Sequence, residues 1–190
     1  MPEATVETLG EEGLIELLGF EGGARGQRLL VPNGDEAAVW SFDRRHANII
    51  TTDHQIEGVH FDLRYTAARD VGRKLMAVNL SDVAAMGGRP RYVLLGVSFP
   101  SATGVATAQG IAQGVRELCK LHGVTVIGGN TTTIDGPISL SATVIGRAEP
   151  GEIVRRRGTQ VGDLIFVTGH LGHARLGLAV AREYGQIDDC

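Results

Sequence analysis

The chain has 190 residues, of which 43% are hydrophobic and 21% charged, and its formal net charge is −4. This length accommodates one large domain, or one domain and part of another, with enough apolar residues for a core. The negative charge argues against a broad nucleic-acid surface, and no run of about 18 apolar residues indicates a membrane span. We therefore expect neither nucleic acid nor a membrane as a partner.

The cysteine content and the N-terminus indicate the compartment. Cys119 and Cys190 are the only cysteines, which excludes a disulfide framework and the ligand spacing of a zinc site. The first residues are acidic and lack the basic region and apolar core of a signal peptide. We therefore expect a cytoplasmic protein.

Hydrophobic periodicity predicts three helices and several strands in the first 150 residues. The first helix is expected over 9–18, because Thr8-Leu9-Gly10-Glu11 resembles a capping box and Gly19 can end the helix. Apolar spacing predicts a second helix around 71–78 and a third over 104–122, which Gly123 ends. The expected strands are 37–41, 47–53, 92–97, 124–128 and 138–147.

A domain boundary is predicted at Glu149-Pro150-Gly151, where turn residues interrupt the pattern. It divides the chain into an N-terminal domain, 1–150, and the beginning of an incomplete C-terminal domain, 151–190. A strand over 164–167 and a helix after Gly172 are expected in the second unit. About 40 residues cannot enclose a core, so we expect residues 164–167 to be poorly covered.

Three acidic segments carry the candidate chemistry. Asp53 ends an apolar run and is followed by Glu57 and His60 in a glycine-containing loop, while Asp35 and Asp82 lie in separate segments. Carboxylates from separate elements repel one another unless a cation lies among them, and oxygen ligands with substrate phosphates suit Mg²⁺. The pattern therefore predicts a magnesium and phosphate site.

Each of these residues also has a structural interpretation. Asp82 follows Ser81 and could stabilise a helix N-terminus. Asp35 follows a glycine and could belong to a tight turn, and His60 could be a packed or surface histidine. The joint occurrence of the three segments favours a functional site.

Two further segments leave alternatives open. Gly128-Gly129 follows an expected strand, where it could bring backbone N–H groups to a phosphate or form a tight structural turn. The segment matches neither a Walker A loop nor a dinucleotide-binding loop. The arginines at 155–157 could be a solvated face or an anion clamp.

Taken in order, five motifs resemble those of thiamine-monophosphate kinases. They cover residues 34–39, 51–53, 57–61, 78–87 and 128–132, and the stretch 156–169 extends the resemblance over nearly the whole chain. The motif with Ser81 and Asp82 is shared loosely with aminoimidazole ribonucleotide synthetase and selenophosphate synthetase. The Glu-Gly-Val-His-Phe motif at 57–61 is more particular to the kinases.

The resemblance implies an α+β fold, in which a mixed-sheet domain of the aminoimidazole ribonucleotide synthetase-like type precedes the start of a second α/β domain. It implies a homodimer that transfers the γ-phosphoryl group of ATP to thiamine monophosphate and forms thiamine diphosphate. The implied Mg²⁺ ligands are Asp35, Thr52, Asp53, Asp82 and Asn130; the implied substrate contact is His60; and the implied ATP contacts are Gly129, Asn130 and Arg156.

The chain departs from the family pattern at several positions. Glu36 and Asn130 stand where the family commonly has Asp, and no aromatic residue lies within 106–114 to contact adenine. One alternative is a non-catalytic nucleotide-binding or dimerisation module, and another is a different ATP-using member of the superfamily. We expect little kinase activity from the 190 residues alone.

Overall fold

The computed structural model describes residues 29–31, 37–41 and 45–185. The helix expected over 9–18 and the candidate ligand Asp35 lie outside the described residues. The described elements are β1 (Leu29–Val31), β2 (Ala38–Trp40), β3 (Ala47–Ile56), α2 (Ala68–Ala85), β4 (Arg89–Phe99), α3 (Val105–His122), β5 (Thr125–Thr133), β6 (Ser139–Ala148), a 3-10 helix (Pro150–Glu152) and α4 (His173–Tyr184).

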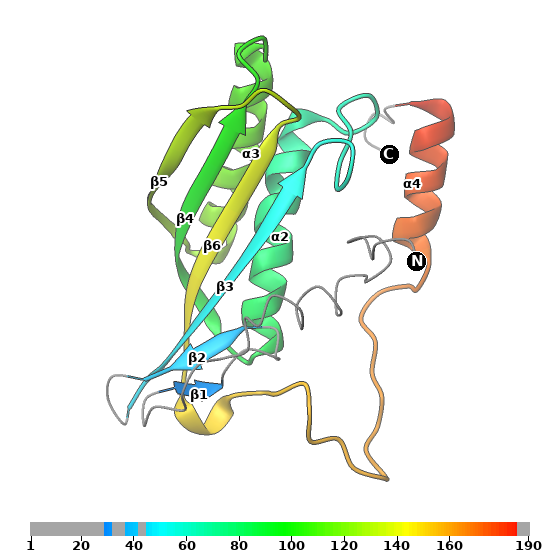
Figure 1. Ribbon diagram of the computed structural model, residues 1–190. Helices are drawn as coiled ribbons and strands as arrows, with labels where there is room; N and C mark the ends of the chain where they lie inside the picture. The colour runs from blue at the N-terminus through cyan, green and yellow to red at the C-terminus, as the bar shows by residue number, and fades with distance from the viewer. Residues whose placement is uncertain (1–28, 32–36, 42–44, 186–190) are drawn as a thin grey trace, which may run out of the picture.

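The strands form one mixed sheet in the order β1-β2-β3-β6-β4-β5. All neighbouring pairs are antiparallel except β4 and β5, which are parallel because α3 connects them as a crossover. Helices α2 and α3 lie side by side on one face of the sheet (Figure 1). This arrangement confirms the predicted α+β class.

The core lies between the sheet and these two helices. In β3, Ala47 and Ile49 are buried and alternate with more exposed residues, as expected for a strand covered on one face. Helix α2 contributes Leu75 and Val83, which are fully buried, and α3 contributes Ile111. None of the helices in the described part of the chain is long and apolar enough to cross a membrane.

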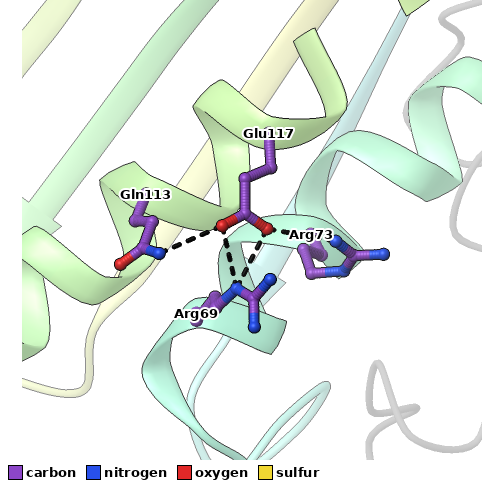
Figure 2. Close-up of polar contacts among 4 residues, drawn as sticks. All are labelled: Arg69, Arg73, Gln113 and Glu117. Atoms are coloured by element: carbon purple, nitrogen blue, oxygen red, sulfur yellow. Dashed lines mark hydrogen bonds and ion pairs between the residues drawn. The ribbon is translucent and has the colours of Figure 1, made fainter. Parts of the chain in front are cut away.

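Helices α2 and α3 approach each other closely because glycines lie at their contact. A Cβ on Gly114 would lie 1.8 Å from the backbone oxygen of Arg69, and one on Gly72 would lie 1.9 Å from that of Ile111. Beside this contact, Glu117 of α3 accepts hydrogen bonds from Arg69 and Arg73 of α2 (Figure 2). Backbone contact and surface ion pairs thus join the two helices.

Two elements extend beyond their predicted limits and change the position of a candidate residue. Helix α2 continues to Ala85, so Asp82 lies in its last turns and not at a helix N-terminus as one interpretation expected. Gly87, with φ of 72°, follows the helix end. Strand β3 continues to Ile56 because it pairs with β6 along its whole length, so Asp53 lies within the strand and does not end it.

The strand expected over 164–167 is wrong, because this segment has no regular secondary structure. Its four apolar side chains are exposed, as the short second unit led us to expect, and Ile165 is 97% exposed. No described strand pairs with the segment, so its backbone has no sheet to join. The helix expected after Gly172 is confirmed as α4, whereas the domain boundary at 150 stays a prediction.

Candidate functional site

The link between β3 and α2 is the centre of the candidate site. The Thr51 hydroxyl donates a hydrogen bond of 2.8 Å to Asp82 Oδ2. Thr51 is only 8% exposed, and Asp82 is partly exposed. The carboxylate is therefore held at the contact between helix and sheet, with access to solvent.

The alternation of side chains along β3 determines which of its residues lie on the same face as the Asp82 carboxylate. Because successive side chains point to opposite faces, Asp53 shares the helix-covered face with Thr51. Thr52 lies on the other face, where its hydroxyl donates to the Ala142 oxygen at 3.1 Å and accepts from the Thr143 hydroxyl at 3.0 Å. The structure therefore brings Thr51, and not Thr52, to Asp82.

Thr51 was not among the site residues predicted from the sequence. The signal that could have found it was the alternation from Ala47 and Ile49, which predicts that position 51 also faces the core. The sequence alone did not show that Asp82 lies on the helix that covers this face.

The donors on the helix-covered face have the chemistry that Mg²⁺ requires. Asp53 and Asp82 supply carboxylate oxygens and Thr51 supplies a hydroxyl, all hard ligands that fit this cation. Among the described residues, no three His, Cys, Asp or Glu side chains lie close enough to hold a metal ion. A complete ligand set for Mg²⁺ would thus have to include Asp35 or phosphate oxygens of the substrates.

The turn that follows β3 presents His60. Gly58 adopts φ of 80°, a conformation that few other residues tolerate, and its N–H donates to the Phe61 oxygen at 2.8 Å. The Ile56 N–H donates to His60 Nδ1 at 3.1 Å, and the Lys74 ammonium of α2 donates to the His60 carbonyl. The His60 residue is exposed, yet hydrogen bonds fix both its backbone and its ring.

A small hollow of about 450 Å³ lies beside this turn, between Gly58 and the end of α4. The Arg64 side chain and backbone N–H both donate to Asp62, and these hydrogen bonds lower the pKa of the Asp62 carboxyl. Arg182 of α4 also lines the hollow. The wall beside the His60 turn is therefore polar.

The glycine pair lies inside β5, so the tight turn considered for Gly128-Gly129 is wrong. The two glycines are part of a strand because β5 pairs in parallel with β4. A Cβ on Gly129 would lie 1.9 Å from the Leu95 backbone oxygen, so this pairing leaves no room for a side chain there. With Asn130, the two glycines line a cavity of about 590 Å³ between α3 and the sheet. Most of its other lining is apolar, including Val97.

Arg156 lies apart from that cavity, in an exposed segment after the 3-10 helix. The neighbouring Arg155 donates to the Leu30 oxygen at 3.3 Å, which ties this segment to β1. The structure thus brings Gly129 and Asn130 to one cavity and leaves Arg156 outside its lining.

Comparisons with known proteins identify the family of the chain. The sequence model of "AIR synthase related protein, N-terminal domain" matches residues 34–148. The chain is 36% identical over 150 residues to the thiamine-monophosphate kinase of Bacillus subtilis, covering 79% of this chain and 46% of that protein. It is 38% identical over 165 residues to that of Caulobacter vibrioides, covering 87% and 46%.

The fold also matches a solved structure described as "AaThiL complexed with AMPPCP and TMP". The TM-score is 0.83 at 32% identity, and the match covers 95% of this chain and 55% of that one. The chain spans about half the length of the curated relatives it matches. Because the family model covers more than half of its residues, the chain belongs to the AIR synthase related family, in which it is similar to thiamine-monophosphate kinases as its motifs predicted.

Proposed function

We propose that the chain is part of a kinase that transfers the γ-phosphoryl group of ATP to thiamine monophosphate and forms thiamine diphosphate. The observation that carries this proposal is that α2 contacts both parts of the candidate site, through Asp82 to Thr51 of β3 and through Lys74 to the His60 turn. The solved relative supports it, because its description names a nucleotide analogue and TMP, which we take as thiamine monophosphate.

In this proposal the oxygen ligands on the helix-covered face hold Mg²⁺. Asp53, Asp82 and Thr51 would bind it there. Asp35 and Asn130 stay ligands that the resemblance implies, and Asn130 lies on β5, which β6 and β4 separate from β3. Thr52 stays a predicted ligand, although its hydroxyl now bonds across the opposite face. Bound Mg²⁺ supplies positive charge that screens the repulsion between the phosphates of the two substrates.

The protein's own contribution is binding and orientation. The acceptor phosphate already carries a nucleophilic oxygen, so the reaction needs no strong general base. The side chains must instead hold two anionic substrates in line, since positioning lowers the entropic part of the barrier. A fixed carboxylate such as Asp82 serves this purpose because its Thr51 hydrogen bond restricts its rotation.

The cavity beside β5 is our proposed site for the ATP base. Its volume of about 590 Å³ and its mostly apolar lining are typical of small-molecule sites with a few polar groups at the edge. Gly129 and Asn130 line this cavity, and Phe99 supplies an aromatic side chain that the segment 106–114 lacks. Arg156 stays a predicted ATP contact, although its segment is tied to β1, at the edge of the sheet opposite β5.

We also propose that two copies associate through the face of the sheet that α2 and α3 leave open. Tyr92 and Leu94 lie on this face and are 47% and 38% exposed, which is unusual for large side chains in the middle of a sheet. Light scattering on the purified protein tests the association of two copies, and a monomer at assay concentration would contradict it.

We propose that the enzyme works in the cytoplasm, as its cysteine content and N-terminus predicted.

The activity is tested on the full-length reading frame that contains this chain. Purified protein is incubated with ATP, Mg²⁺ and thiamine monophosphate, and thiamine diphosphate is measured by chromatography. Mg²⁺-dependent product formation is the expected result. Absence of product from folded protein over a broad Mg²⁺ range would refute the proposal; ATP binding without turnover would favour the non-catalytic module, and turnover that ignores thiamine monophosphate would favour another member of the superfamily.

A further inference from the structure

The turn after β3 is fixed more firmly than its exposure suggests. The Val59 and His60 N–H groups both donate to the Ile56 oxygen, at 3.1 and 2.8 Å, and the Glu57 N–H donates to the Ile138 oxygen at 3.0 Å. Turn hydrogen bonds of this kind restrict the backbone before any ligand arrives. The position of the His60 ring is therefore a property of the free protein.

The hydrogen bonds also determine which ring nitrogen of His60 carries the proton. A backbone N–H can only donate, so the Ile56 N–H at 3.1 Å makes His60 Nδ1 an acceptor. A neutral imidazole has one donor and one acceptor nitrogen, which leaves the hydrogen on Nε2. His60 thus presents an N–H donor at Nε2 and requires an acceptor on its ligand.

Lys74 is a second residue of this arrangement, to which the motifs assigned no role. Its ammonium group donates to the His60 carbonyl across a separation of 14 residues in the sequence. Lys74 belongs to α2, the helix that also carries Asp82. The contact therefore fixes the turn relative to the helix that holds the candidate metal ligand.

The spacing along β3 indicates which end of the substrate meets His60. Ile56 lies three positions after Asp53, which corresponds to about 10 Å along a strand. If the substrate phosphate lies at the carboxylates, His60 lies near the opposite end of the molecule. In thiamine monophosphate an ethyl chain, the thiazolium ring and a methylene bridge separate the phosphate from the aminopyrimidine, whose ring nitrogens are acceptors.

Resting on the proposed function, we propose that His60 donates its Nε2–H to a ring nitrogen of the substrate aminopyrimidine, and that Lys74 is a positioning residue that holds the turn for this contact. This assignment makes the turn after β3 a specificity element for the pyrimidine end of the substrate. It requires no contact between His60 and the phosphate.

The first test uses substrate analogues with the full-length enzyme. In the monophosphates of two analogues, CH replaces either N1′ or N3′ of the pyrimidine. With the unchanged enzyme, one analogue is expected to raise KM about tenfold relative to thiamine monophosphate, because one hydrogen bond is lost, while KM for ATP stays constant. His60→Ala should remove this discrimination, and His60→Gln, whose amide can donate from a similar position, should keep part of it.

Several outcomes would overturn the inference. If both analogues behave as thiamine monophosphate does, or if the discrimination survives in His60→Ala, His60 does not read the ring nitrogen. Long-range nitrogen-proton NMR of the free protein provides a readout other than activity, and a His60 signal with the hydrogen on Nδ1 would also overturn it. An unchanged enzyme that is inactive with thiamine monophosphate would overturn the proposed function together with this inference, so the two failures are distinguishable.

The second test separates positioning from general stability. Lys74→Met is expected to raise KM for thiamine monophosphate several-fold and to leave kcat, KM for ATP and Tm close to the unchanged values. Lys74→Arg should restore the lower KM, because a guanidinium can also donate to the His60 carbonyl. Parallel losses in both KM values with a lower Tm would show a purely structural lysine and overturn its positioning role.

Discussion

Replacing Gly114 by alanine is expected to destabilise the protein, although alanine is the better helix former. The new Cβ would lie 1.8 Å from the Arg69 backbone oxygen and 2.7 Å from the Arg73 backbone nitrogen. Ordinary contact begins at 3.4 Å, so the helices must separate by the difference, about 1.6 Å. Backbone atoms inside a helix cannot rotate away as a flexible side chain can.

The magnitude follows from two opposing contributions. Overpacking typically costs about 1 to 3 kcal/mol, and the upper end applies because both clashing atoms belong to the backbone of α2. Alanine in place of glycine in a helix interior returns about 1 kcal/mol. The exposed pairs of Glu117 with Arg69 and Arg73 add little to this balance, because solvent screens them (Figure 2). The expected net loss is about 2 kcal/mol.

Urea unfolding followed by circular dichroism measures this loss. The midpoint should fall while the slope stays constant, since the native surface changes little. Gly177→Ala is a matched control, because Gly177 also lies in a helix but a Cβ there would meet nothing within 4 Å. It should cause no loss of stability. A Gly114→Ala protein as stable as the unchanged one would refute the close backbone approach of the two helices.

Three further predictions concern the candidate site and the helix contact. Asp82→Asn should remove most activity of the full-length enzyme with an unchanged circular dichroism spectrum, and near-normal turnover at low Mg²⁺ would exclude Asp82 as a metal ligand. Thr51→Val should raise the Mg²⁺ concentration for half-maximal activity more than Thr52→Val does; the reverse order would mean that the open-face hydroxyl is the ligand. The hydrogen bond from Arg69 lowers the pKa of Glu117, so its contribution to stability is present above the ordinary glutamate pKa and is lost as pH falls through the lowered value. Urea midpoints between neutral and acidic pH should therefore fall less for Glu117→Gln than for the unchanged protein, and equal slopes would contradict this role.

Periodicity predicted most of the elements because their spacing depends on local geometry. Strand β6 and helix α3 lie close to their expected ranges, and Gly123 ends α3 in a left-handed conformation as expected. Longer-range packing decided the errors. Leu80 and Val83 extend the buried stripe of α2 past Ser81, which overrides the local signal for a helix start.

The residues of the site were easier to predict than their faces and contacts. The motifs indicated Asp53, Asp82 and His60, but choosing Thr51 over Thr52 requires knowing which face of β3 the helix α2 covers. The Lys74 contact with the His60 carbonyl depends on the turn and on the placement of α2, neither of which leaves a local pattern in the sequence. The metal and substrate roles stay predictions, since only their relative placement follows from the fold.

Helix α2 connects the stability of the fold with the geometry of the proposed reaction. Lys74 and Asp82 lie eight residues apart on it, about 12 Å along the helix, close to the distance between Asp53 and Ile56 on the facing strand. One rigid element thus sets the spacing between the His60 turn and the Asp82 carboxylate. Gly114→Ala, which pushes α2 away from α3, should therefore lower kcat/KM even where the variant is fully folded, because small misplacements of substrates in line are costly. Unchanged kcat/KM in the folded variant would show that the site tolerates movement of this helix.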